Sequence, residues 1–528
     1  MTAPSSSGDS LAPLRHRTFA VLWVATVVGN IGSFMRDVAS AWVVTDLSAS
    51  PAAVAMIQAA ATLPIFLLAI PAGVLSDILD RRRFLIGIQV LLAAVSCTLM
   101  VLSHTGAQTL LSLTLLTLLG GVGAALMGPT WQSIVPELVD RSSLRSAVAL
   151  NSLGINIARA IGPAAGGLLL GLLGASYTYG ADVLTYVFVI GALLWWRRPV
   201  AAPDALSENF TGALRAGMRF TRSSRELHRV MIRVAVFFAF SSAVWALLPL
   251  VARKLLGGTA GFYGLMLGAV GLGAIGGAVL LPRVRDKLGP DGLMLAAAGV
   301  VAAVLLALSV APPQWLALVL MLVLGAGWIT ALTTLNGVAQ GILPNWVRGR
   351  GLAVYLTVFN GAMTAGSLAW GGVAQAIGVP MTLAASAVGL VVSALVARRI
   401  ALPSGDADLQ PSNHWPEPLT ALADAGDRGP VMIQVEYQVK EADRAAFFAS
   451  MDALSAIRRR DGAYAWGLMD DTERPGFIVE WFLVESWAEH LRQHHRVSHA
   501  DADLQAETAR WHSGDQRPVV RHLLAVKR

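Results

Sequence analysis

Twelve stretches of this 528-residue chain are long and apolar enough to cross a lipid bilayer. A helix needs about 20 apolar residues to span the hydrocarbon core, and a spanning segment has to satisfy its own backbone hydrogen bonds. The sequence therefore predicts an all-α membrane body with 12 transmembrane helices. The stretches lie near residues 18–45, 51–77, 84–103, 107–135, 145–173, 176–196, 230–253, 260–282, 291–311, 314–341, 350–377 and 379–398.

The basic residues between these stretches are distributed unevenly. Connections that alternate to one face of the bilayer carry 22 Lys and Arg residues, whereas the other face carries only Arg253 and Lys254. Because Lys and Arg accumulate in cytoplasmic loops, this imbalance places both termini in the cytoplasm. The basic residues form short clusters without the continuous basic face that phosphate binding needs, so nucleic acid is excluded as a partner.

The last 128 residues differ from the membrane body in net charge and in sequence pattern. Residues 1–400 carry a net charge of +13, whereas residues 401–528 carry −6. Four prolines indicate a stiff linker over 401–429, and the pattern beyond it has the order β-α-β-β-α-β. The sequence predicts a small cytoplasmic α+β domain of ferredoxin-like type over 430–528. Its expected strands are 431–437, 463–470, 477–484 and 518–526, with helices at 441–460 and from Ser486 onward.

Two segments of the membrane body are similar to each other. The segment 136–151 (PELVDRSSLRSAVALN) has a counterpart at 344–360 (PNWVRGRGLAVYLTVFN), and the glycine pair at 166–167 has one at 371–372. The similarity predicts two parallel six-helix repeats. Parallel repeats place a solute site between them near the bilayer midplane, which is typical of a transporter.

The predicted halves, residues 18–196 and 230–400, follow a cytoplasmic segment over 1–17 and are separated by a connection at 197–229. In this connection four apolar residues alternate with arginines at helical spacing, which is typical of an amphipathic helix on the inner leaflet. A solvated linker is the alternative. The apolar residues are Phe210, Leu214, Met218 and Phe220.

The chain leaving the second stretch, GVLSDILDRRR at 73–83, resembles the loop signature of the major facilitator superfamily. The matching residues are Gly73, Asp77, Arg82 and Arg83. Ile78 and Asp80 depart from the signature, so the charge network is expected to differ in detail. The resemblance implies a gating loop in which Gly73 allows close helix packing; a positive-inside clamp without gating is the alternative.

The sequence GPAAGG in the fifth stretch resembles the end of the antiporter signature of the same superfamily. Ala149 and Ala158 stand where that signature has its first glycines, so half of the motif is present. Small residues and a proline predict close packing and a hinge in this helix. The hinge residues are Gly162, Pro163, Gly166 and Gly167.

A wider resemblance covers nearly the entire chain. PTWQSIVPEL, RAIGP, WALLP and RGR in the membrane body, with RDGAYAWG and SWAEHLRQH in the C-terminal domain, are similar to the transmembrane secretion effector branch of the superfamily, which includes enterobactin exporters. This resemblance implies a proton-coupled exporter of hydrophobic, amphipathic or siderophore-like small molecules in a bacterial inner membrane. No Walker A sequence is present, so a gradient is the expected energy source and no cofactor is expected.

Four charged residues fall within the apolar stretches, where ionisable groups are functional candidates. Asp37 is the first candidate for the group that takes up and releases the proton, with Arg36 or Arg159 adjusting it. Neighbouring residues on a helix point about 100° apart, so Arg36 and Asp37 are not required to pair. The alternative is that both reach the outer interface. Asp182 lies near a loop and is interpreted as a helix cap.

Neutral polar and aromatic residues in the stretches are candidates for the wall of a substrate cavity. Packing against lipid or at the interface is the alternative for each aromatic side chain. The candidates are Asn30, Phe34, Trp131, Asn156, Trp245, Asn336, Tyr355 and Asn360.

Two histidine pairs in the C-terminal domain, His490 with His494 and His495 with His499, have the spacing of helical metal ligands. The sequence indicates no third ligand, so a solvated histidine-rich helix is preferred and no metal is expected. The domain resembles dimeric α+β barrels, some of which are small monooxygenases. A membrane-tethered enzyme or sensor acting on the transported compound is therefore the alternative function, and a homodimer through this domain stays open.

Overall fold

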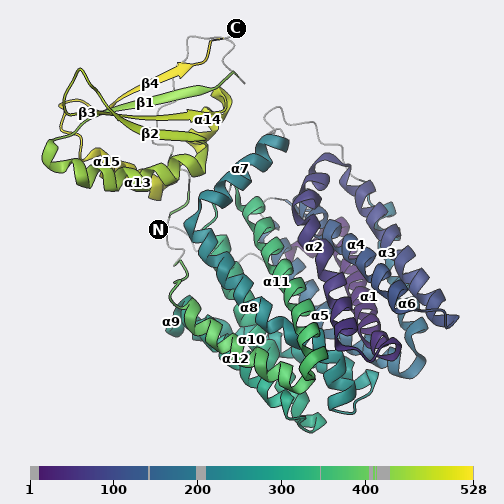
Figure 1. Ribbon diagram of the computed structural model, residues 1–528. Coiled ribbons are helices and arrows are strands. Elements are labelled where there is room, and N and C mark those ends of the chain that lie inside the picture. Colours follow the sequence, from purple (N-terminus) through teal and green to yellow (C-terminus); the bar gives the residue numbers. More distant parts are fainter. Residues whose placement is uncertain are drawn as a thin grey trace, which may run out of the picture. The chain divides into compact units, whose positions relative to one another are not determined.

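The computed structural model describes residues 11–140, 143–197, 210–344, 346–403, 408–410, 412 and 428–526. Within this part of the chain, 12 helical segments are long and apolar enough to cross a membrane, as the sequence predicts (Figure 1). The chain divides into two compact units. The first comprises Met1–Ala202, Met231–Asn336 and Ala353–Ala401, and the second comprises Pro203–Val230, Gly337–Leu352 and Leu402–Arg528.

The spanning helices are α1 (Arg17–Leu47), α2 (Pro51–Ile78), α3 (Arg81–His104), α4 (Leu110–Leu138), α5 (Leu144–Leu173), α6 (Ala175–Trp195), α8 (Arg225–Leu250), α9 (Ala260–Ser309), α10 (Gln314–Gly341), α11 (Arg348–Ile377) and α12 (Val379–Ala397). Two predicted stretches share α9, whose path breaks at Gly289 (φ 61°, ψ 177°) directly before Pro290. Glycine adopts positive φ without a Cβ clash, and proline suits the start of the next helix. The two candidate spans of α9 are Ala260–Arg285 and Lys287–Ser309, and the break lies close to the start of the second span.

Small residues set the closest helix approaches in the first unit. In α5, a Cβ on Gly162 would lie 2.6 Å from Phe34 Cβ, and one on Gly166 would lie 2.7 Å from Met35 Cα of α1. On another face of α5, a Cβ on Gly167 would lie 2.5 Å from Gly264 Cα of α9. Helix α5 therefore joins α1 of its own predicted half to α9 of the other half. The hinge role of these residues stays a prediction.

The second unit contains α7 (Phe210–Ser223), the turn between α10 and α11, and the C-terminal domain. The elements of this domain are β1 (Val431–Gln438), α13 (Arg444–Asp461), β2 (Ala465–Asp470), β3 (Phe477–Val484), α14 (Trp487–Arg496), α15 (His499–Ala509) and β4 (Val519–Leu524). The strands pair antiparallel in the order β2-β3-β1-β4, and α13 and α15 lie against one face of the sheet (Figure 1). The assignment to dimeric α+β barrels remains a prediction.

The single helix expected from Ser486 onward is two helices. Helix α14 ends at Arg496, and α15 begins at His499 after a capping box formed by Ser498 and Asp501. A capping box satisfies the first backbone N–H groups of a new helix and so favours a start at this point. The prediction that His495 and His499 share one helix face is therefore wrong.

The core of the C-terminal domain follows the predicted pattern. Phe447 and Met451 of α13 are buried against the sheet, as their common side of the helix indicates. A buried ion pair crosses the same core, with Arg458 Nε 3.1 Å from Glu480 Oε1. Trp466 Nε1 also donates to Glu480 Oε1 at 3.0 Å. The polar groups of this core therefore satisfy one another, which is expected of a stably folded domain.

Candidate functional site

A charged cluster is buried where α1 meets α6. Arg36 Nη1 donates to the Tyr186 hydroxyl at 2.9 Å, and Arg36 Nη2 donates to Asp37 Oδ1 at 3.0 Å. Arg36 Nη1 also lies 3.7 Å from Asp182 Oδ2. An arginine at the centre of a bilayer costs roughly 3 kcal/mol or more, so partners of this kind are needed to hold it there.

The structure corrects the interpretation of Asp182 as a helix cap. Helix α6 begins at Ala175, about two turns earlier, and Asp182 is fully buried (0% exposed). Its Oδ2 accepts a hydrogen bond from Ser96 Oγ of α3 at 2.6 Å. Asp182 is thus the buried anion of the Arg36 cluster. Together with Tyr186, it is a member of the site that the sequence did not indicate.

One glycine makes room for this cluster. A Cβ on Gly32 of α1 would lie 2.6 Å from Asp182 Oδ1 and would collide with the side chain of Thr185. The absence of a side chain at Gly32 lets α1 pack directly onto α6. The Arg36 guanidinium lies next to Gly120 of α4, where a Cβ would be 3.6 Å from Arg36 Cζ, in ordinary van der Waals contact.

The three predicted coupling residues are not all brought together. Asp37 is the accessible member, with 56% of its side chain exposed, and it does pair with Arg36. Arg159 makes no hydrogen bond or ion pair with another of the described residues. Arg36 therefore pairs with Asp37, whereas Arg159 does not, and the role of either arginine in proton uptake by Asp37 stays a prediction.

Polar contacts join the two predicted halves where α1 ends and where the π-helical turn Val251–Leu255 follows α8. Arg253 forms an ion pair with Asp46, and Arg253 Nη1 donates to Thr45 Oγ1 at 2.7 Å. Lys254 Nζ donates to the Ala49 carbonyl oxygen at 2.8 Å. These five residues are called the Arg253 latch below. The two basic residues that the sequence assigns to the outer face are thus both used across the interface.

Further contacts between the halves lie beside this latch. The rings of Trp42 and Tyr263 stack with centroids 5.9 Å apart, and the Arg253 guanidinium lies 5.4 Å from the Trp42 ring centroid. Between α2 and α11, the hydroxyl oxygens of Thr62 and Thr364 are 2.7 Å apart. The interface therefore combines ionic contacts at one end with neutral contacts along the helices.

The residues of the predicted gating loop have separate environments. A Cβ on Gly73 would meet nothing within 4 Å, so the close packing expected there is wrong. Asp77 belongs to α2, but its side chain lies outside the described part of the structure. Arg82 donates to two carbonyl oxygens at the end of α6, at 2.8 and 2.7 Å. The N–H of Arg83 binds Asp80, the N-cap of α3, at 2.8 Å.

The candidate cavity residues have different surroundings. Trp131 belongs to a buried apolar cluster, and Trp245 packs edge-on to Trp328 with ring centroids 5.0 Å apart. Tyr355 is buried, and Asn360 donates to a carbonyl oxygen of its own helix at 2.8 Å. Trp131 is therefore a packing residue. The half-buried candidates are Asn30, Phe34, Asn156, Trp245 and Asn336.

In the second unit, ion pairs join α7 to the C-terminal domain. Arg219 Nη2 lies 2.9 Å from Glu489 Oε1, which also accepts from Arg496 Nη1 at 2.6 Å. Phe220, expected to enter lipid, is 2% exposed and packs edge-on to Trp346 with ring centroids 5.8 Å apart. The predicted helix is present, but this part of its apolar side contacts protein. The side chains of Phe210 and Leu214 lie outside the described part of α7.

Comparison with known proteins decides the family. A family model described as a transmembrane secretion effector matches residues 8–528, which include the C-terminal domain. The chain belongs to this family of the major facilitator superfamily. This chain is 25% identical over 264 residues to the staphyloferrin A transporter of Staphylococcus aureus, with 49% of this chain and 65% of the relative covered. It is also 22% identical over 243 residues to macrolide efflux protein A of Streptococcus pyogenes, covering 46% and 60%.

A longer match is to the multidrug efflux pump Tap of Mycobacterium tuberculosis, at 25% identity over 400 residues, with 73% of this chain and 94% of the relative covered. The staphyloferrin and macrolide proteins are each matched over less than two thirds of their length. The relatives named here are all bacterial. Together with the 12 apolar helices, the family assignment makes this chain a multi-pass membrane protein.

Solved structures show the same fold. A bacterial homologue of the human lysosomal transporter Spinster, in an inward-facing and unoccupied conformation, superposes with a TM-score of 0.59 at 14% identity, covering 75% of this chain and 98% of that protein. The nucleoside transporter NupG gives a TM-score of 0.60 at 12% identity, with 72% and 99% covered. At such identities the likeness establishes the major facilitator fold alone.

Proposed function

We propose that this protein is a secondary active exporter of hydrophobic, amphipathic or siderophore-like small molecules, driven by a proton gradient. The observation that carries this proposal is the Arg36 cluster, because ionisable residues held within membrane spans mark ion or substrate pathways. Relatives named for staphyloferrin A, macrolide and multidrug transport support export of small molecules across a bacterial inner membrane.

Arg36 is shared between two carboxylates, and this arrangement suits proton coupling. Deprotonated Asp37 pairs with Arg36, whereas protonation of Asp37 removes that partner. The guanidinium then keeps Asp182 and Tyr186, so its charge stays compensated in the membrane. Proton uptake therefore changes the contacts of α1 without leaving a buried charge alone.

The Arg253 latch supplies the matching conformational element. With both termini in the cytoplasm, as the positive-inside rule indicates, the latch lies on the outer side and holds the two halves together there. Alternating access between parallel repeats requires the outer contacts to break when the site opens outward. The contacts described above thus correspond to a state closed to the outside.

An accumulation assay tests this function. Cells of an efflux-deficient bacterium that express the wild-type protein are loaded with ethidium, as an amphipathic probe, or with staphyloferrin A, as a siderophore probe. We expect lower retention of at least one probe than in cells that express the Asp37→Asn variant at the same level. Equal retention of both probes in the two strains would contradict the proposal.

A further inference from the structure

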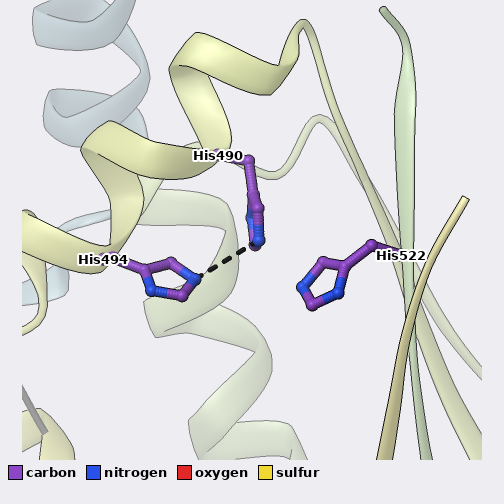
Figure 2. Close-up of side chains that lie close together, drawn as sticks. All are labelled: His490, His494 and His522. Carbon is purple, nitrogen blue, oxygen red and sulfur yellow. Dashed lines mark hydrogen bonds between the residues drawn. The ribbon is translucent and has the colours of Figure 1, made fainter. Parts of the chain in front are cut away.

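Three histidine side chains of the C-terminal domain converge on one point (Figure 2). His490 and His494 lie one turn apart on α14, and His522 reaches them from β4. The Nε2 atoms of His490 and His494 are 3.3 Å apart. One ring nitrogen of each of the three residues lies within 4.8 Å of the others. The third ligand position that the sequence did not indicate is thus supplied by a strand.

The sheet and the helix cap fix this convergence. His522 is paired with Ile433 of β1, whose side chain is buried in the core, so His522 is on the side of the sheet that bears the helices. Ser486 caps α14 by accepting a hydrogen bond from the N–H of Glu489 at 3.2 Å. The ring of Trp487 lies 5.6 Å from that of His490 and 5.8 Å from that of His522 and forms a wall beside them.

The burial of the three rings suits ligand binding. His490 is 2% exposed, whereas His494 and His522 are half-buried, so the cluster has a buried side and an accessible side. Burial and the neighbouring imidazoles lower the pKa of His490 to about 3. The His490 ring is therefore neutral at cytoplasmic pH, which is the form that coordinates metal ions.

The spacing of the nitrogens matches a tetrahedral metal ion. Two imidazole nitrogens bound at 2.0–2.1 Å to a tetrahedral zinc ion are about 3.3–3.4 Å apart. The His490 and His494 Nε2 atoms already have this separation. His522 requires only a small side-chain rotation, because its nearest ring nitrogen lies within 4.8 Å of theirs.

We propose that His490, His494 and His522 bind one divalent first-row transition ion of the Zn²⁺ class. Imidazole ligands suit Zn²⁺, Co²⁺, Ni²⁺ and Cu²⁺, whereas Ca²⁺ and Mg²⁺ prefer oxygen ligands. Three protein ligands leave a fourth position for water or another ligand, as in catalytic rather than closed structural zinc sites.

A neighbouring amide supports the orientation of His490. Gln493 lies three residues after His490 on the same helix face and is 1% exposed. Its Oε1 atom has no hydrogen-bond partner among the described residues. Metal-bound histidines usually donate their other N–H to an acceptor outside the coordination shell. Gln493 Oε1 is expected to accept from His490 Nδ1–H when Nε2 holds the metal.

Metal binding to the full-length protein tests the proposal. The protein is purified in detergent with a tag that contains no histidine, stripped with EDTA, and titrated separately with Zn²⁺ and Co²⁺. The variants are His490→Gln, His494→Gln and His522→Gln. His499→Gln is the matched control, because His499 is exposed at the start of α15 and lies outside the cluster. Affinity is measured by calorimetry and geometry by the absorption spectrum of bound Co²⁺.

We expect one ion per chain, a tetrahedral Co²⁺ spectrum, and unchanged binding in the control. Each cluster variant removes a metal ligand and should lower the metal affinity by more than about 100-fold. Loss of a residue that only hydrogen-bonds to a ligand lowers metal affinity by roughly 10–100-fold. If His490→Gln fails to fold, the half-buried His494 and His522 positions still decide the question. Absence of stoichiometric binding to the wild type would overturn the proposal, as would wild-type affinity in the His522→Gln variant.

Discussion

The guanidinium of Arg36 and the carboxylate of Asp182 lie 3.7 Å apart, and both side chains are buried between α1 and α6. Asp182→Asn removes the buried carboxylate and leaves Arg36 with Asp37, whose side chain is 56% exposed, so the loss should reach part of the about 3–5 kcal/mol that breaking a buried ion pair costs. We therefore expect Asp182→Asn to lower the melting temperature of the detergent-purified protein markedly. Asp46→Asn is the control, because Asp46 is half exposed and such pairs contribute about 1 kcal/mol at most. Equal melting temperatures for the two variants would contradict the assigned role of Asp182.

Asp37→Asn is expected to uncouple transport from the proton gradient, so that the transport rate no longer depends on the pH difference across the membrane. Arg36 retains Asp182 and Tyr186 in this variant, so folding should change by about 1 kcal/mol or less. Transport should then proceed at the same rate with and without an imposed pH gradient. Arg159→Gln provides the comparison, since Arg159 has no contact with Asp37 among the described residues, and it should keep the gradient response. A normal response in Asp37→Asn would show that another group carries the proton.

Locking the Arg253 latch should stop the transport cycle. The chain has one native cysteine, so Cys97→Ser gives a cysteine-free background. Asp46→Cys with Arg253→Cys, joined by a short reducible cross-linker, should block transport, because the outer side can no longer open. Reductant should restore it, and each single cysteine variant should be unaffected by the reagent. Transport by the cross-linked protein at the rate of the reduced protein would argue against the latch.

Gly167 controls the approach of α5 to α9. Gly167→Ala places a Cβ 2.5 Å from Gly264 Cα, and overpacking of this kind costs about 1–3 kcal/mol. The variant should therefore be less stable than the wild type and slower in transport. Gly276→Ala, on α9, is the matched control because a Cβ there meets nothing within 4 Å. Thermal melts that rank the two variants equally would contradict this packing.

Arg219 is expected to hold α7 in place within the second unit. Its ion pair with Glu489 is largely shielded from solvent, and α7 also packs against α13. Arg219→Ala should increase amide hydrogen exchange in α7 several-fold, because local opening becomes easier when such contacts are lost. Arg222→Ala, on an exposed position of the same helix, should leave exchange unchanged. Identical exchange in both variants would contradict the role of Arg219.

The spans were predictable from sequence because apolar length alone determines them. The elements of the C-terminal domain were predictable from alternation and turn residues, except for the break before His499, where a local cap overrides helical periodicity. The family also followed from the sequence, because its motifs are local segments.

The residues of the Arg36 cluster and of the histidine cluster are brought together by tertiary contacts. Their membership could therefore not be predicted from local sequence patterns. Asp182 is joined to Ser96 over 86 positions of the chain, so only the packing of α6 on α3 distinguishes a buried anion from a cap. His522 meets His490 because β4 lies next to β1, and strand order is not local information. Glycines such as Gly32 were the available signal for the first site, since small residues mark close approaches.

Transport by the purified protein in proteoliposomes tests the central claim most directly. Ethidium or staphyloferrin A is enclosed on the cytoplasmic side, and its movement is followed with and without an imposed pH gradient, acidic on the outer side. The account predicts that the gradient accelerates export of at least one of these solutes and that a protonophore abolishes the acceleration. Transport at the same rate with and without the gradient would contradict proton coupling through the Arg36 cluster.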